Sequence, residues 1–137
     1  MLRDSSLAPL DDGTLARRIA EAGAAIDSAA EAELYCRLAP RVRLYGLRHL
    51  REPNAAADLV QQVLLMTIER LRAGEVREPE RIASFVLGAC RMTVLDWRRS
   101  SRRREALLKE RGAPAEAYEA PEPPALEWVK VPPERRF

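Results

Sequence analysis

The sequence predicts an all-α fold, a small helical bundle followed by a proline-rich extended segment. Apolar residues recur every three or four positions in several long stretches, which is the spacing of one helix face. No stretch alternates apolar and polar residues as a half-buried strand would. The 137 residues, 47% of them hydrophobic, suffice for one domain with a modest core. We therefore expect a flexible leader over residues 1–13, a helical domain over 14–111, and a linker-like, partly disordered tail over 112–137.

The first two helices are delimited by capping residues. Thr14 is expected to cap a short helix, and Asp27 or Ser28 to cap the second, because these side chains accept hydrogen bonds from the free amides of a first turn. Pro40 should kink or briefly break the second helix, since proline lacks the amide hydrogen. The apolar stripe of the second helix is Leu34, Leu38, Val42 and Tyr45.

A third helix is expected from near Asn54 to about Ala73, after an end to the second at Glu52 and Pro53. Its buried arc should hold Ala56, Leu59, Val60, Val63, Met66, Thr67 and Leu71. Its opposite arc holds Asp58, Gln61, Gln62, Leu65, Glu69 and Arg72. Leu65 is the apolar exception there. It is either an ordinary exposed leucine or the apolar anchor of a protein contact with a polar rim, and the residues alone leave both interpretations open.

The longest expected helix covers residues 79–104 and changes character partway. Its first half carries an apolar face of Ile82, Phe85, Val86, Ala89 and Thr93. A basic run follows, and between Arg91 and Arg111 eight Arg or Lys residues stand against three acids. Arginines beside the Trp97 ring suit nucleic acid, because they neutralise phosphate while the ring can stack on an unpaired base. The alternative is a solvated helix end favoured by the helix dipole, with Trp97 capping the core.

Several classes of function are not favoured by the residues present. Cys36 and Cys90 are far apart, and with His49 as the single histidine the sequence does not favour a zinc site; both cysteines are expected to be buried free thiols. No set of residues suits nucleophilic or acid–base catalysis, so we expect neither an enzyme nor a cofactor. No apolar run fits a signal peptide or a membrane span, so the cytoplasm is the expected compartment.

Two stretches, in this order, resemble a known family. Residues 58–71 read DLVQQVLLMTIERL, which is similar to the polymerase-binding helix of bacterial sigma factors, usually Asp-Leu-Val-Gln-Glu-Val-Phe. Residues 85–103 read FVLGACRMTVLDWRRSSRR, which resembles the promoter helix of the extracytoplasmic-function class. The chain departs from the family pattern at Gln62, Leu64, Phe85, Val86 and Met92. The resemblance covers roughly residues 14–105 and implies the promoter-melting region 2 domain.

The resemblance also implies partners and contact residues. In that family the domain clamps onto a coiled coil of the largest subunit of core RNA polymerase, captures a flipped base of the promoter minus-ten element and holds the melted strand open. The positions implied to bind polymerase are Asp58, Gln61, Gln62 and Leu65. The positions expected to bind DNA are Arg91, Trp97, Arg98, Arg99, Arg102 and Arg103, with the loop over residues 74–81. An anti-sigma factor is a further candidate partner.

The stretch after Arg111 departs most from the family. A complete member of the class continues into a helix-turn-helix that reads the minus-thirty-five element, whereas residues 112–137 are too short and too proline-rich for that fold. The chain is then a fragment, works with a separate promoter-anchoring protein, or does not initiate transcription. Two rival functions stay open beside promoter melting: a helical protein-interaction module that binds polymerase without opening DNA, and a generic basic DNA binder.

Overall fold

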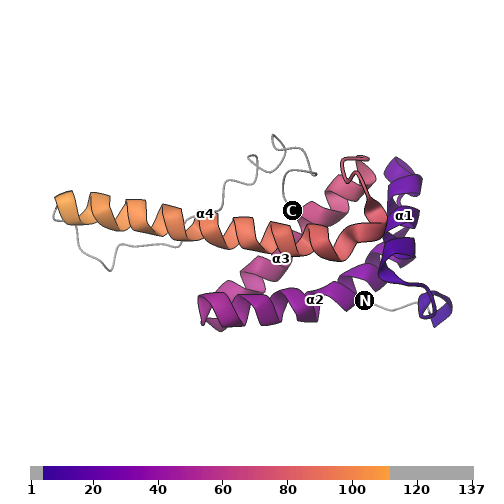
Figure 1. The fold of residues 1–137 in the computed structure, drawn as a ribbon, viewed down its shortest axis with the longest axis horizontal. Helices are drawn as coiled ribbons and strands as arrows, with labels where there is room; N and C mark the ends of the chain where they lie inside the picture. The colour runs from indigo at the N-terminus through magenta and orange to yellow at the C-terminus, as the bar shows by residue number, and fades with distance from the viewer. Residues whose placement is uncertain (1–4, 112–137) are drawn as a thin grey trace.

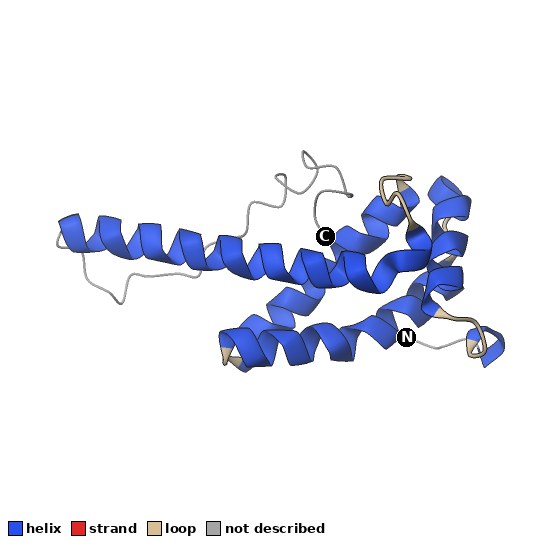
Figure 2. Cartoon of the chain, viewed as in Figure 1, coloured by secondary structure: helices blue, strands red, loops and turns tan. Residues whose placement is uncertain are grey.

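Four α-helices form the part of the chain that the computed structural model describes, residues 5–111 (Figures 1 and 2). The helices are α1 (Asp12–Ala22), α2 (Ser28–Leu50), α3 (Pro53–Arg72) and α4 (Ile82–Arg111). Short 3-10 turns are η1 (Ser5–Leu7), η2 (Gly23–Ala25) and η3 (Pro79–Arg81). No strand occurs within these residues. The predicted all-α bundle is confirmed, while the expected tail over 112–137 lies outside the described residues.

A tight turn joins α2 to α3. Arg51 ends α2 in the left-handed conformation, with φ of 56°. Glu52 then caps α3, and its carboxylate accepts a hydrogen bond from the amide of Asn54 at 3.0 Å. The two helices approach closely near this turn because Gly46 has no side chain: a Cβ there would lie 2.9 Å from the Cα of Ala56. The boundary predicted at residues 52–53 is therefore correct to within two residues.

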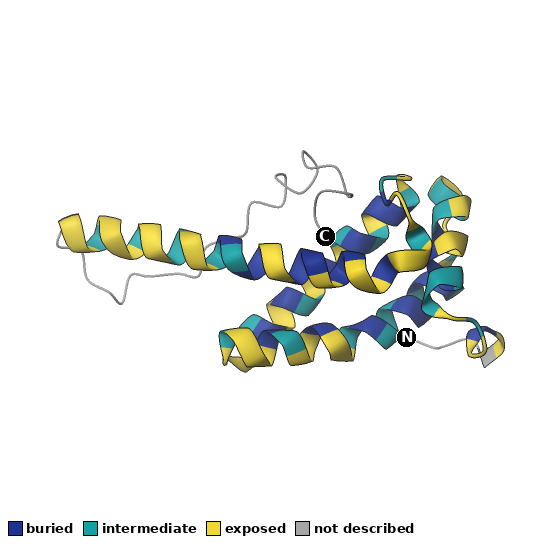
Figure 3. Cartoon of the chain, in the orientation of Figure 1, coloured by how far each residue is buried: buried dark blue, intermediate teal, exposed yellow. Residues whose placement is uncertain are grey.

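The apolar core lies where the four helices meet. α4 lies against both α2 and α3, and α1 closes one end of the bundle (Figure 1). The buried residues of each helix face inward toward the others (Figure 3). The core includes Leu15 and Ile19 of α1, Leu34, Leu38 and Val42 of α2, Leu59, Val63, Leu64 and Leu71 of α3, and Ile82, Phe85, Val86 and Ala89 of α4. All of these except Leu64 follow the helical spacing expected from the sequence.

One local prediction is wrong, and another is corrected in part. Asp11, not Thr14, caps α1, because the Asp11 carboxylate accepts a hydrogen bond from the amide of Thr14 at 2.7 Å. The helix thus begins earlier than the apolar spacing indicated. A kink or a brief break was predicted at Pro40; the break does not occur, because α2 continues through this residue. Pro40 is exposed, while Leu38 and Val42 on either side are buried in the core, and this packing holds the helix together across the missing amide.

The segment expected to be a flexible leader packs against α2 over residues 5–10. Leu7 is buried with 3% of its surface exposed. Arg37 of α2 holds the segment: Nη2 donates to the carbonyl oxygens of Leu7 and Ala8 at 3.0 and 3.2 Å, and Nη1 donates to that of Leu10. The Nε of Arg37 donates to the buried carboxylate of Glu33 at 2.7 Å. One guanidinium therefore joins the start of the described chain to the core.

Candidate functional site

The helix α4 belongs to the bundle in its first half only. Its inner residues from Ile82 to Val94 are buried, whereas none of residues 98–110 is buried (Figure 3). The second half projects beyond the other three helices (Figure 1). At a rise of about 1.5 Å per residue, the stretch from Arg98 to Arg111 is roughly 20 Å long. The change of character read from the sequence therefore coincides with the point where the helix leaves the bundle.

The five arginines expected to bind DNA are all exposed, but their surroundings differ. Arg91, Arg102 and Arg103 form no ion pair with any residue in 5–111, so their charge is available to a ligand. Arg99 lies 4.0 Å from a carboxylate oxygen of Asp96, and an ion pair of this length at the surface contributes little to stability. The free arginines thus begin beside the bundle and continue along the projecting half of α4.

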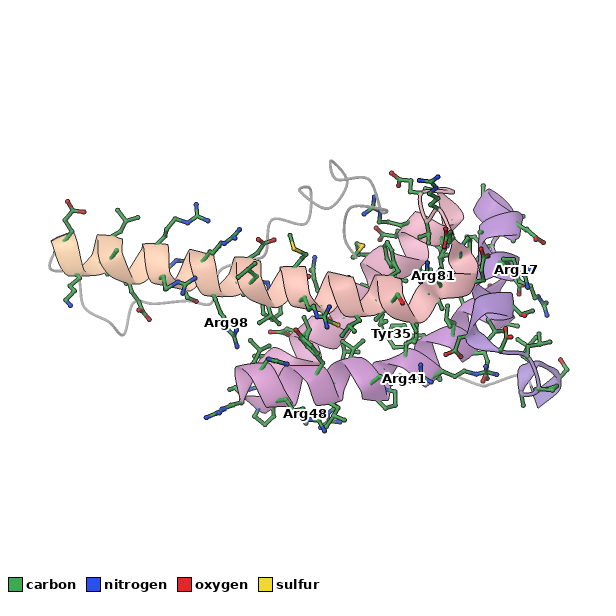
Figure 4. All side chains as sticks on the ribbon, viewed as in Figure 1. Arg17, Tyr35, Arg41, Arg48, Arg81 and Arg98 are labelled. Carbon is green, nitrogen blue, oxygen red and sulfur yellow. The ribbon has the colours of Figure 1, made fainter. Side chains whose placement is uncertain are left out.

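Arg98 has a structural role as well. Its Nη2 donates to the carbonyl oxygen of His49 at 2.7 Å, and the side chain points from α4 toward α2 (Figure 4). His49 lies in the last turn of α2, where carbonyl oxygens lack partners within the helix and carry partial negative charge. A cation placed there is stabilising. Arg98 therefore ties the base of the projecting helix to the end of α2.

Trp97 lies at the same junction and packs against the core. The residue is half-buried, and its Nε1 is enclosed without a hydrogen-bond partner among the described residues. One turn earlier, Thr93 is fully buried, and its Oγ1 also has no such partner. In this conformation the indole nitrogen cannot reach a base. The position of Trp97 therefore fits a residue that caps the core better than it fits a freely exposed ring that stacks on a base.

The polar arc of α3 is exposed as predicted. Asp58, Gln61 and Leu65 are all exposed, and Leu65 has 48% of its surface accessible. They are three, four and seven residues apart and so share one side of the helix. Gln62 is half-buried at the edge of that side. The arrangement is an apolar side chain with acidic and amide neighbours, on the face opposite the core.

One feature near these surfaces was not foreseen from the sequence. Arg70 is buried with 4% exposure, and its guanidinium carbon lies 5.9 Å from the centre of the Phe85 ring. Burial lowers the pKa of Arg70, and the nearby Glu75 opposes that shift. Helical spacing could have predicted the burial of Arg70, because this residue is two turns after the buried Val63 and so lies on the same face of α3. The basic outer face on the second half of α2, by contrast, is what the run RVRLYGLRHLRE over residues 41–52 indicates.

No three His, Cys, Asp or Glu side chains between residues 5 and 111 are grouped to hold a metal ion. Burial raises the pKa of the Cys90 thiol to about 12, so this group stays protonated at neutral pH. Cys36 is only half-buried, so the prediction of two buried thiols holds for Cys90 alone. No helix in the described part is long and apolar enough to cross a membrane.

Comparison with protein families, with curated proteins and with solved structures finds no match to this chain.

Proposed function

We propose that this chain is a sigma-type promoter-melting domain, in which α3 binds core RNA polymerase and α4 contacts the opened strand of the minus-ten element. One observation carries the proposal. Two helices that pack on each other through the core present different chemistry outward: α3 a polar arc centred on Leu65, and α4 a row of arginines that continues past the bundle. A protein and a polyanion can therefore bind side by side without sharing a surface.

The polymerase contact is proposed on α3. An exposed leucine among polar side chains has the composition of a small interface core with a hydrogen-bonding rim. Leu65 supplies the apolar area, while Asp58 and Gln61 can accept or donate hydrogen bonds around it. The sequence of this helix is also one of the two stretches that resemble sigma factors. Both considerations support the same partner.

The DNA contact is proposed on α4. Opening base steps costs a few kcal/mol, which a protein offsets through contacts with the separated strand. Arg91, Arg102 and Arg103 supply charge that no residue in 5–111 neutralises. Such contacts are blind to sequence and weaken as salt rises. We propose that they hold the strand, and that Arg98 chiefly positions the helix that carries them.

A second function is favoured by Trp97. Because its Nε1 is enclosed and its ring packs against the core, the chain offers less aromatic surface for base capture than the sequence indicated. A helical module that binds polymerase through α3 and does not open DNA fits this position. The two functions differ in one measurable respect: promoter melting requires a preference for single-stranded over double-stranded minus-ten DNA.

Fluorescence anisotropy with labelled minus-ten DNA, single- or double-stranded and with or without core polymerase, tests the DNA contact. We expect tighter binding to the single strand. The variant Arg102→Gln/Arg103→Gln should flatten the salt slope on single strands by about 0.7 for each phosphate that is no longer neutralised. The matched control Arg17→Gln/Arg18→Gln removes two exposed charges from α1 and should leave the slope unchanged. Equal slopes for the two variants would refute a specific role for α4.

A pull-down with core polymerase tests the α3 contact. Leu65→Arg should abolish association while leaving the melting temperature unchanged, because the site is exposed. Ile26→Arg is the matched control, since Ile26 is an apolar side chain that is 44% exposed on another part of the surface. The α3 interface is wrong if Leu65→Arg binds polymerase as well as the control does.

A further inference from the structure

The second half of α2 exposes two leucines between arginines, on a surface that we call the α2 outer face. Its members are Arg43, Leu44, Leu47, Arg48 and Arg51. All five are exposed, with 49% of Leu44 and 36% of Leu47 accessible. Members three, four or seven positions apart are neighbours on one side of a helix. Arg48 lies on the side of α2 that faces away from α4 (Figure 4).

The charge of the α2 outer face is unbalanced within the described residues. Arg43, Arg48 and Arg51 form no ion pair with any residue in 5–111. By contrast Arg41, on the same helix, is paired with Asp12 at 3.1 Å. A phosphate backbone would need only the arginines. The leucines between them fit a peptide that carries both carboxylates and apolar side chains.

The chain contains such a peptide. Residues 116–129 read EAYEAPEPPALEWV, with four glutamates and no Lys or Arg. The apolar side chains of this segment are concentrated in Leu126, Trp128 and Val129, next to Glu127. Its charge and its apolar content are both complementary to the α2 outer face. We propose that the segment 116–129 of this chain docks on the α2 outer face.

The length of the chain permits this contact. Arg98 touches the last turn of α2, so the end of α4 at Arg111 lies thirteen residues, or about 20 Å of helix, beyond that point. Glu122 and Glu127 follow Arg111 by eleven and sixteen residues, which at full extension span about 35–55 Å. The segment can therefore return along α4 and reach α2. Because it is tethered, its effective concentration is in the millimolar range even if each contact is weak.

Docking would cover the exposed leucines and neutralise arginines that a free polyanion would otherwise attract. It is therefore a built-in competitor for anionic ligands of the neighbouring arginines, and its strength should fall with ionic strength. This inference goes beyond the proposed function and does not rest on it. A domain that bound no polymerase and no promoter would still carry the same two complementary surfaces.

Acrylamide quenching of tryptophan fluorescence in the full chain tests the contact. Trp97→Phe leaves Trp128 as the single tryptophan. We expect Trp128 to be less accessible to acrylamide than in a synthetic peptide of residues 116–129. Arg43→Glu/Arg48→Glu should raise its quenching constant to the value of the free peptide. The matched control Arg17→Glu/Arg81→Glu reverses two exposed charges elsewhere and should have no effect. An equal response of the two charge-reversal variants overturns the proposal.

A charge swap and a second measurement make the test independent of either single variant. Adding Glu119→Lys/Glu122→Lys to the α2 charge reversal should restore protection of Trp128. In the otherwise native chain, Glu119→Gln/Glu122→Gln should shift backbone amide resonances of residues 43–51. Shifts confined to α4 overturn the proposal. So does binding of anionic phospholipid vesicles or single-stranded DNA to the α2 outer face with an affinity that these glutamine substitutions leave unchanged, because the face is then open.

Discussion

Replacing Phe85 by Ala should cost about 4 kcal/mol of the free energy of unfolding. Phe85 is the largest fully buried side chain among the described residues, with 1% of its surface exposed. Buried Phe→Ala changes cost about 3–5 kcal/mol, from lost transfer energy and from the cavity left behind. The guanidinium of Arg70 over the ring adds a cation–π contact, worth about 0.5–2 kcal/mol, that alanine also removes. The Phe85 ring therefore contributes to stability both by apolar burial and by its cation–π contact with Arg70.

Urea unfolding followed by far-ultraviolet circular dichroism measures this cost. A loss of 4 kcal/mol corresponds to a melting temperature lower by roughly 16 °C or more in a domain of about 100 residues. Phe85→Leu keeps most of the volume but loses the ring face, so it should cost less, about 1.5 kcal/mol. Leu87→Ala is the matched control on the same helix, because Leu87 is 41% exposed, and it should have little effect. A loss below about 1 kcal/mol for Phe85→Ala would refute the burial of the ring.

Three further predictions concern the bundle itself. Arg37→Met should destabilise by about 3 kcal/mol and expose residues 5–10 to limited proteolysis, whereas Arg41→Met, whose ion pair is exposed, should cost at most about 1 kcal/mol. Hydrogen bonds with the side chain and amide of Thr14 lower the pKa of Asp11. The stabilisation of the fold by this carboxylate is therefore complete above the ordinary pKa near 3.8 and is lost as pH falls through the lower pKa of the folded state. The difference in unfolding free energy between the parent and Asp11→Ala, measured by urea unfolding, should shrink in that acidic range. Cys90 should resist thiol reagents at pH 8 until the chain unfolds, so labelling of the native protein should stop at one thiol.

The helices could be predicted because they obey local rules. Helical spacing placed Leu34, Leu38 and Val42 in the core, and the turn between α2 and α3 follows from Pro53, which suits the first turn of a helix. The buried face of α4 and the exposed arc of α3 were predicted in the same way. Apolar periodicity reports which side of a helix is buried, and that information is contained in the segment itself.

What could not be predicted depends on contacts between distant residues. Arg37 and the carbonyl oxygens that it binds are about thirty positions apart. Because every residue has a backbone carbonyl, the sequence does not show which one will accept a hydrogen bond. The same holds for the bond between Arg98 and His49, which are 49 positions apart. Spacing could not decide the role of Trp97, because its position fits the end of the buried stripe as well as it fits a solvent-facing site. Long polar side chains that reach across the fold were therefore missed, although their neighbours were placed correctly.

These long contacts decide which arginines can test the proposed DNA contact. If α4 binds DNA as proposed, removing Arg98 would weaken binding by two routes that a titration cannot separate: the loss of one positive charge, and a broken hydrogen bond between α4 and the end of α2. Arg102 and Arg103 lie farther along the same helix and have no contact of that kind within the described residues. A change in the salt slope at those two positions therefore measures the ligand alone. If only substitution of Arg98 weakened DNA binding, the orientation of α4 would matter more than the charge that it carries, and the surface at the junction with α2 would be the one to map.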